Sequence, residues 1–145
     1  MRGSVTLPLR LERPCQTSQQ VAEFLASDPR ITHVAYPGLP NDPQHQRAAA
    51  QLHGGFGAVV SVAIAGAHQD RVRFVNDLQV ITSAVSLGHD ETLIAYEEYP
   101  RARAAAFDAP FREHGLIRLA VGLESAQDLI TDLDAALTTV YGAHQ

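Results

Sequence analysis

The last third of the chain places a strand pattern directly before a helix pattern, and this pairing restricts the possible folds most. Residues 116–123 alternate in polarity, so that Ile117, Leu119 and Val121 share one face of the expected strand. Ser125 can cap the helix that follows. The apolar side chains of that helix fall on one stripe: Leu129, Ile130, Leu133, Leu137, Val140 and Tyr141. A strand with one apolar face and an amphipathic helix after it predict a sheet covered by helices on that face.

The preceding residues mix further strand and helix patterns, with no internal repeat. We expect helices at 18–27, 43–52 and 68–78, and strands at 31–36, 58–64, 80–85 and 92–95. A rigid polar opening is expected at 1–14, and Thr17 or Ser18 can cap the first helix. The charged region 97–113 fits either a loop or a helix. Together these elements predict an α+β two-layer sandwich, in which helices cover one face of a small, mostly antiparallel sheet.

Composition narrows the class of protein. A chain of 145 residues that is 46% hydrophobic is expected to form one packed domain. It contains no apolar run long enough to predict a membrane span. A net charge of −5 and the absence of a basic stripe argue against nucleic-acid binding. The lone cysteine, Cys15, fits a reducing compartment, so a cytoplasmic location is expected, and no predictable general base lies beside it to make it a nucleophile.

The chain contains no lysine, because all eleven of its basic residues are arginines. A lysine amine is the group that forms a Schiff base with a carbonyl cofactor or substrate. Chemistry of that kind therefore needs a side chain that this sequence does not supply.

Several features that resemble functional motifs have ordinary explanations. The glycine-rich run 54–57 precedes a strand rather than a helix, so a turn into that strand is expected instead of a phosphate loop. The seven histidines lack metal-ligand spacing, and we expect neither a metal site nor a catalytic residue in this chain. The remaining carboxylates that lie near one another in sequence are expected to be solvated: Glu97, Glu98, Asp132 and Asp134.

Arg118 is the one charged residue in the apolar closing strand. Arg118, Ala120 and Gly122 are expected to point away from the apolar face, which would leave open space beside the guanidinium. A guanidinium in such a place can bind a carboxylate with two parallel hydrogen bonds. Periodicity alone equally fits an ordinary exposed strand arginine.

Four groups of residues, taken in order, carry a family resemblance. They are Arg2-Gly3 with Thr6-Leu7 and Arg10; Tyr36-Pro37-Gly38-Leu39; Val85-Ser86-Leu87-Gly88 with Glu91-Thr92-Leu93-Ile94; and the run 115–124 with Asp128-Leu129-Ile130 and Asp132-Leu133. Together they resemble the C-terminal small domain of the cysteine/methionine-metabolism (trans-sulfuration) enzymes, which depend on pyridoxal phosphate. The motifs are most similar to those of methionine γ-lyase and the O-acylhomoserine sulfhydrylases.

The resemblance implies a division of labour between two domains. Residues 1–14 would be the junction between the domains, and 15–145 the small domain of a fold-type I enzyme. A large domain, absent from this sequence, would supply the Schiff-base lysine and bind the cofactor. In this chain Arg118 would bind the substrate α-carboxylate, and Val85, Ser86 and Leu87 would line the same site.

Two positions bear on the substrate implied by the resemblance. Family members that handle cystathionine tend to carry a glutamate where this chain has Val85, so an apolar, methionine-like side chain suits Val85 better. After Ile94 the family usually shows a His-Pro segment, whereas this chain reads Ala95-Tyr96-Glu97-Glu98-Tyr99-Pro100. This departure affects substrate choice and any subunit contact made there.

The sequence leaves three functional hypotheses open. In the first, the chain is the substrate-binding part of a carbon–sulfur lyase or γ-replacement transferase and is inactive alone. In the second, it is a module that docks onto a separate large-domain chain, so its partners are that domain, in cis or in trans, and an amino acid; a homo-oligomer is compatible with both. In the third, it is a free amino-acid-binding or interaction domain.

Overall fold

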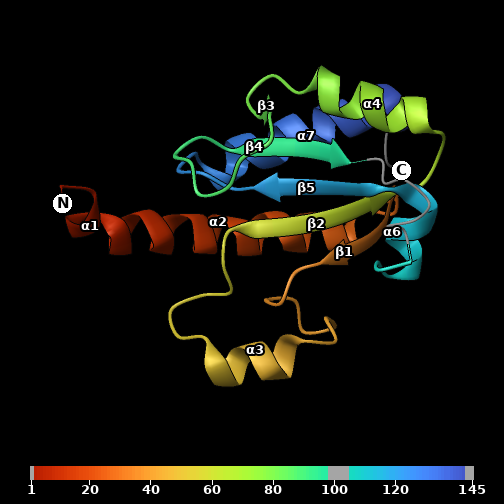
Figure 1. Cartoon of the computed structure of the whole chain (residues 1–145). Helices are drawn as coiled ribbons and strands as arrows, with labels where there is room; N and C mark the ends of the chain where they lie inside the picture. Colours follow the sequence, from red (N-terminus) through yellow and green to blue (C-terminus); the bar gives the residue numbers. More distant parts are fainter. Residues whose placement is uncertain (1, 98–104, 143–145) are drawn as a thin grey trace.

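The computed structural model describes residues 2–97 and 105–142, which form one mixed sheet with surrounding helices (Figure 1). The helices are α1 (Arg2–Val5), α2 (Leu7–Ser27), α3 (His45–Gln51), α4 (His68–Asp77), α6 (Ala109–His114) and α7 (Ala126–Tyr141). The strands are β1 (Ile31–Ala35), β2 (Val59–Ile64), β3 (Thr82–Ser83), β4 (Leu93–Glu97) and β5 (Leu116–Ala120). Among these described residues, none of the helices has the length and apolar character that crossing a membrane requires.

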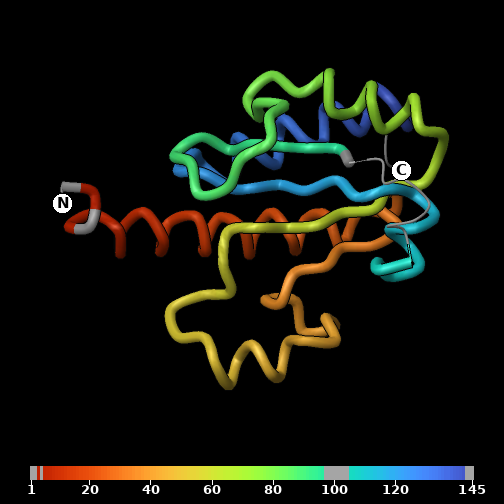
Figure 2. Tube along the Cα trace, viewed as in Figure 1, coloured from red at the N-terminus to blue at the C-terminus, as the bar shows by residue number. Residues whose placement is uncertain are grey.

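The sheet has the order β1-β2-β5-β4-β3, so the last strand of the chain lies in its middle (Figure 2). Three of the four strand pairs are antiparallel, and only β3 and β4 run parallel. The predicted α+β sandwich with a mostly antiparallel sheet is thereby confirmed. The predicted strand at 80–85 is shorter than expected, since only Thr82 and Ser83 pair with β4.

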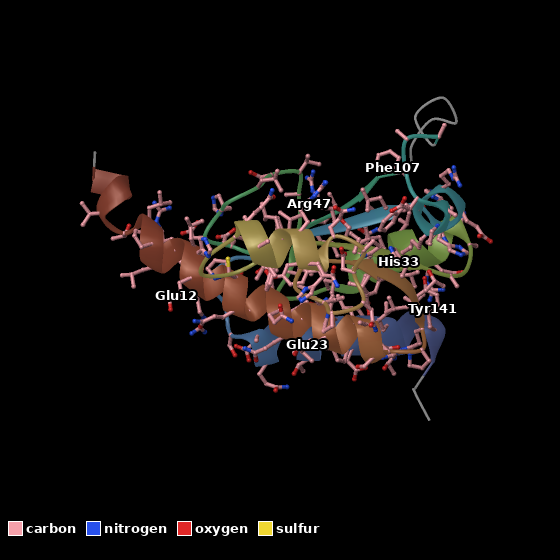
Figure 3. The ribbon with its side chains drawn as sticks, turned by 90° about the horizontal axis from the view of Figure 1, so that it is seen from below. Glu12, Glu23, His33, Arg47, Phe107 and Tyr141 are labelled. Carbon is pink, nitrogen blue, oxygen red and sulfur yellow. The ribbon has the colours of Figure 1, made fainter. Side chains whose placement is uncertain are left out.

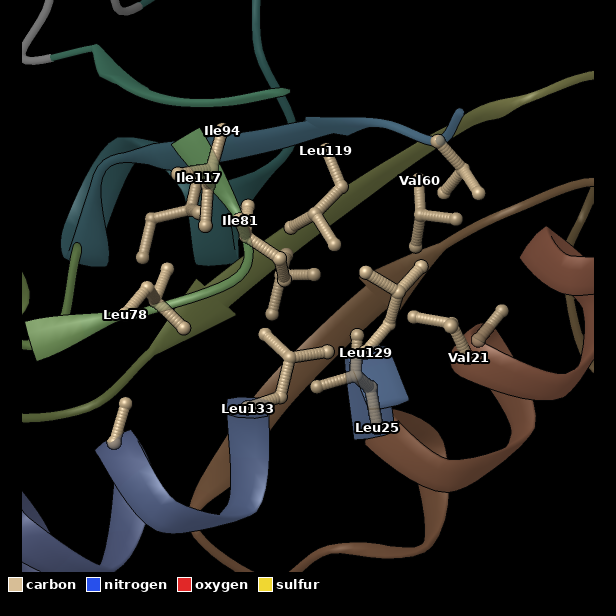
Figure 4. Close-up of a cluster of buried hydrophobic side chains, with 14 of the residues drawn as sticks. Val21, Leu25, Val60, Leu78, Ile81, Ile94, Ile117, Leu119, Leu129 and Leu133 are labelled. Atoms are coloured by element: carbon tan, nitrogen blue, oxygen red, sulfur yellow. The ribbon is translucent and has the colours of Figure 1, made fainter. Parts of the chain in front are cut away.

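The main core lies between the sheet and the three long helices α2, α4 and α7 (Figure 4). Its largest fully buried side chains include Val21, Leu25, Val60, Ile94, Ile117, Leu119, Leu129 and Leu133. A smaller cluster on the opposite face joins Phe111 of α6 to Ala63 and Leu116. Figure 3 shows α2 and α7 on one side of the sheet and the segment from Phe107 into α6 on the other. The long helices therefore cover one face, as predicted, and among the helices that the structure describes only short α6 packs on the other.

Helix α2 begins eleven residues earlier than the predicted start at 18, because it starts at Leu7 rather than after Pro14. Thr17 and Ser18, the predicted caps, are instead buried inside the helix. Pro8 fits the first turn, where backbone N–H groups have no partner within the helix. Pro14 removes one internal hydrogen bond, and its burial against the rest of the domain compensates for that loss.

Arg30 ties the turn after α2 to the closing helix. Its guanidinium pairs with the buried carboxylate of Asp28 and with Asp134 of α7, and it donates to Thr138 Oγ1 over 2.9 Å. The hydrogen bond to Asp28 is the largest cause that raises the pKa of Arg30. Asp134, predicted to be solvated, is about half exposed but takes part in this ion pair.

Tyr141 near the end of α7 makes the fold sensitive to high pH. Burial raises the pKa of its phenol to about 12, above the value of about 10 in an unfolded chain. The phenol is therefore harder to ionise in the folded state, so its contribution is complete below pH 10 and is lost as the pH rises through 12. We expect the midpoint of urea denaturation to fall between pH 10 and 12, and Tyr141→Phe to reduce that fall. An equally steep fall in Tyr141→Phe would contradict this assignment.

Candidate functional site

Arg118 lies in the middle of the central strand β5. Its neighbours across the sheet are Ser61 on β2 and Ala95 on β4, both small residues. Ile117 and Leu119, on either side of it in the strand, belong to the main core, so alternation directs Arg118 to the opposite face. The partly buried Arg118 thus stands on the central strand between two short side chains of the neighbouring strands.

The expectation that Gly122 helps to leave open space beside the Arg118 guanidinium is wrong. Gly122 lies beyond the end of β5, where the backbone of residues 90–92 packs directly against its Cα. A Cβ at this position would lie 2.7 Å from the backbone nitrogen of Thr92 and closer still to Asp90 and Glu91. Gly122 therefore permits a close backbone approach instead of leaving room for a ligand.

The other predicted site residues lie on the loop that follows β3. Val85 is 78% exposed, Leu87 is 57% exposed, and Ser86 between them is exposed as well. The loop follows β3, and β4 lies between β3 and β5, the strand that bears Arg118. Arg118 and the loop 84–91 thus lie in the half of the sheet formed by β5, β4 and β3. The described residues leave the side chains of Val85 and Leu87 exposed.

One end of this loop is anchored to the connection between β5 and α7. The buried backbone N–H of Thr92 donates to Glu124 Oε1 over 2.6 Å, and the Thr92 hydroxyl donates to Glu124 Oε2 over 2.6 Å. The same hydroxyl accepts a hydrogen bond from Gly122 N over 2.9 Å. Thr92 and Glu124 both lie inside the recognised motifs, but their pairing spans 32 positions and no local pattern predicts it.

The connection between α4 and β3, which precedes the loop, is anchored through Asp132 of α7. Its carboxylate accepts hydrogen bonds from three consecutive backbone N–H groups, those of Gln79, Val80 and Ile81, over 2.8–3.0 Å. Asp132 is only 7% exposed, so the prediction that it is solvated is wrong. These bonds also explain why the strand predicted from residue 80 begins at Thr82, because the N–H groups of Val80 and Ile81 are directed to the carboxylate.

Tyr96 occupies the segment where the chain departs from the family pattern. Its hydroxyl accepts a hydrogen bond from Arg71 Nε over 3.1 Å and lies 3.1 Å from His68 Nδ1. Arg71, which is 7% exposed, also donates to the backbone oxygens of Ile64 and Gly66. Tyr96 thus packs toward α4, on the core side of the sheet. The rest of that segment, 98–100, lies outside the described residues.

The chemistry of the side chains present does not fit covalent attachment of pyridoxal phosphate. The cofactor is held in such enzymes as a Schiff base with a lysine amine, and this chain has no lysine. Within 2–97 and 105–142, no three His, Cys, Asp or Glu side chains are grouped so as to hold a metal ion. The lysine of such enzymes is therefore not supplied by this chain.

Known proteins are similar to this chain over nearly its whole length. Residues 1–138 match the family model described as Cys/Met metabolism PLP-dependent enzyme. A canavanine gamma-lyase of Pseudomonas canavaninivorans is 48% identical over 143 residues, which cover 97% of this chain and 36% of that protein. An L-methionine gamma-lyase of Fusobacterium nucleatum subsp. polymorphum is 37% identical over 149 residues, again covering 97% of this chain and 36% of the relative.

A solved structure shows the same fold. Cystathionine gamma synthase from Xanthomonas oryzae pv. oryzae superposes with a TM-score of 0.84 and 37% sequence identity, and the match covers 96% of this chain and 36% of that one. The chain therefore spans about a third of the length of the relatives that it matches.

Proposed function

We propose, because this chain belongs to the Cys/Met metabolism family of PLP-dependent enzymes, that it provides the substrate-carboxylate site of such an enzyme. In this proposal residues 15–145 form the small domain and 1–14 the junction to the domain that bears the lysine. The complete enzyme would be a lyase or γ-replacement transferase acting on an amino acid, and this chain would be inactive alone. The cytoplasmic location remains a prediction.

The position of Arg118 is the observation that carries the proposal. The side chain projects from the central strand toward the face opposite the three long helices, with Ser61 and Ala95 beside it. Both neighbours are short, and Arg118 is partly exposed on this face. A planar guanidinium binds a carboxylate through two parallel hydrogen bonds, and so fixes both the position and the orientation of the amino acid.

The exposed Val85 favours a substrate whose side chain carries no charge. An apolar side chain cannot pair with a distal ammonium group, so methionine and homocysteine-like substrates suit this position. L-Canavanine is a second candidate, because two canavanine gamma-lyases are 48% and 46% identical to this chain. Both amino acids present the same α-carboxylate to Arg118.

The first turns of α2 support docking onto a larger domain, in cis or in trans. These turns extend past the sheet (Figures 1 and 2), and Leu7 and Leu11 are 44% and 54% exposed there. Both leucines continue the helix face that buries Val21 and Leu25 farther along α2. An apolar stripe that runs beyond its own core fits an interface with another domain. A module that docks onto a separate large-domain chain is the second candidate function.

Mixing the chain with a lysine-bearing partner tests the proposal. The partner is the part of the Pseudomonas canavaninivorans relative that this chain does not match, loaded with pyridoxal phosphate. Consumption of L-methionine or L-canavanine is expected only in the mixture. Arg118→Lys should raise the KM about tenfold, because it keeps the charge but loses the second hydrogen bond, and Arg118→Ala should lower kcat/KM about a hundredfold.

Arg112→Lys is the matched control, since Arg112 is an exposed arginine on α6, and it should leave both constants unchanged. Association of the two proteins can be followed separately by sedimentation. A stable complex with no activity toward either amino acid, or an active complex insensitive to Arg118→Ala, would refute the proposed site.

A further inference from the structure

We propose that Glu124 is a positioning residue of the substrate site, which acts through Thr92 to fix the loop carrying Val85 relative to the strand carrying Arg118. The inference depends on the proposed function, because it assigns a role in that same site. Neither Glu124 nor Thr92 is itself placed against the substrate.

The contact between these two residues uses both carboxylate oxygens on one partner. Glu124 accepts from the backbone N–H of Thr92 with one oxygen and from its hydroxyl with the other, each over 2.6 Å. Thr92 is fully buried and Glu124 is partly buried, so these charge-assisted bonds are partly shielded from water. A single side chain therefore fixes both the backbone and the side chain of Thr92.

Two further bonds close the connection. Gly122 N donates to Thr92 Oγ1 over 2.9 Å, and Leu123 N donates to the Asp90 carbonyl over 2.8 Å. Three consecutive residues, 122–124, thus make hydrogen bonds to Asp90 and Thr92. They come one residue after β5, which carries Arg118 four positions before Gly122. The end of the loop is consequently mounted on the same strand as the guanidinium.

The loop itself has little other support. Every residue from Thr82 to Asp90 is exposed, and beyond β3 the backbone bond from Ala84 N to Ile94 O holds its start. A loop that is exposed along its length takes its position from its fixed ends. A substrate held by Arg118 and reaching toward Val85 would span β5, β4 and β3. The bonds between Glu124 and Thr92 would therefore set the distance between Arg118 and Val85.

Substitutions at Thr92 separate this role from general stability. Thr92→Val removes the hydroxyl at nearly constant volume, and Thr92→Ser restores it. In the chain alone, Thr92→Val is expected to speed amide hydrogen exchange about tenfold at residue 92, Gly122 and Leu123, whose N–H groups are bonded in this connection, while β1 and β2 keep their rates. Thr92→Ser should exchange like the original chain. A uniform increase over the whole sheet would show a merely structural role and overturn the inference.

The mixture with the lysine-bearing partner supplies the second measurement. Thr92→Val should raise the KM about tenfold with kcat changed less than twofold, and Thr92→Ser should restore the KM. Thr139→Val, an exposed substitution on α7, is the matched control. An active original mixture in which Thr92→Val leaves the KM unchanged overturns this inference alone. An original mixture that associates but stays inactive overturns the proposed function, and this inference with it.

Discussion

Replacing Gly122 by alanine is expected to destabilise the chain by about 4 kcal/mol, enough to leave much of it unfolded. The added Cβ would lie within 3 Å of three backbone atoms, in Asp90, Glu91 and Thr92. Backbone atoms cannot rotate away as the end of a side chain can. The chain must therefore separate the end of β5 from the start of β4, which also breaks the hydrogen bonds of Thr92. Urea denaturation followed by circular dichroism measures the loss.

Gly54→Ala separates the effect of the clash from that of removing a glycine. Gly54 has a φ of +91° and no atom within 4 Å of an added Cβ, so alanine there meets backbone strain without a clash. We expect that variant to lose only about 1 kcal/mol. If Gly122→Ala were as stable as Gly54→Ala, the close approach of residues 90–92 to Gly122 would be wrong.

Removing the carboxylate of Asp132 is expected to have the second largest effect, a loss of about 3 kcal/mol of unfolding free energy for Asp132→Ala. Three backbone N–H groups would lose their acceptor, and that of Ile81 is buried. The connection between α4 and β3 would then be held only weakly. Limited proteolysis should show new cleavage near residues 79–84, and urea denaturation gives the free energy.

Asp128→Ala is the matched control on the same helix. Asp128 is exposed in the first turn of α7, where it contributes only its favourable interaction with the helix dipole. A loss of about 0.5 kcal/mol is expected there. Asp132→Asn should fall between the two, because its amide oxygen still accepts hydrogen bonds while its NH₂ group faces backbone donors. Equal stability of Asp128→Ala and Asp132→Ala would exclude the anchoring role of Asp132.

The sequence predicted those elements whose pattern is local and repeated. The alternation around Ile117 and Leu119 gave β5, and the apolar stripe of α7 gave the closing helix and the face that it covers. The start of α2 could not be predicted in this way. Two prolines favour a non-helical opening by local preference, and the packing that overrides this preference involves residues far along the chain.

In the candidate site, too, the features set by local pattern could be predicted and those set by distant contacts could not. The direction of Arg118 follows from strand periodicity, which needs no partner to be known. The roles of Asp132 and Glu124 do not follow, because each carboxylate binds backbone groups 32 to 53 positions away. A carboxylate on a helix looks the same in sequence whether water or backbone N–H groups surround it. The function of Arg118 stays a prediction until the mixture is assayed.

The central place of β5 has a consequence for how the chain folds. β2 and β4 both pair with β5, so the sheet lacks its middle until residues 116–120 are in place. During synthesis β2 therefore keeps one edge unpaired while residues 65–115 are made, and β4 keeps its edge unpaired until β5 follows. Pairings that span such long stretches form slowly. We expect refolding to be limited by the insertion of this strand, and aggregation to compete most strongly before that step.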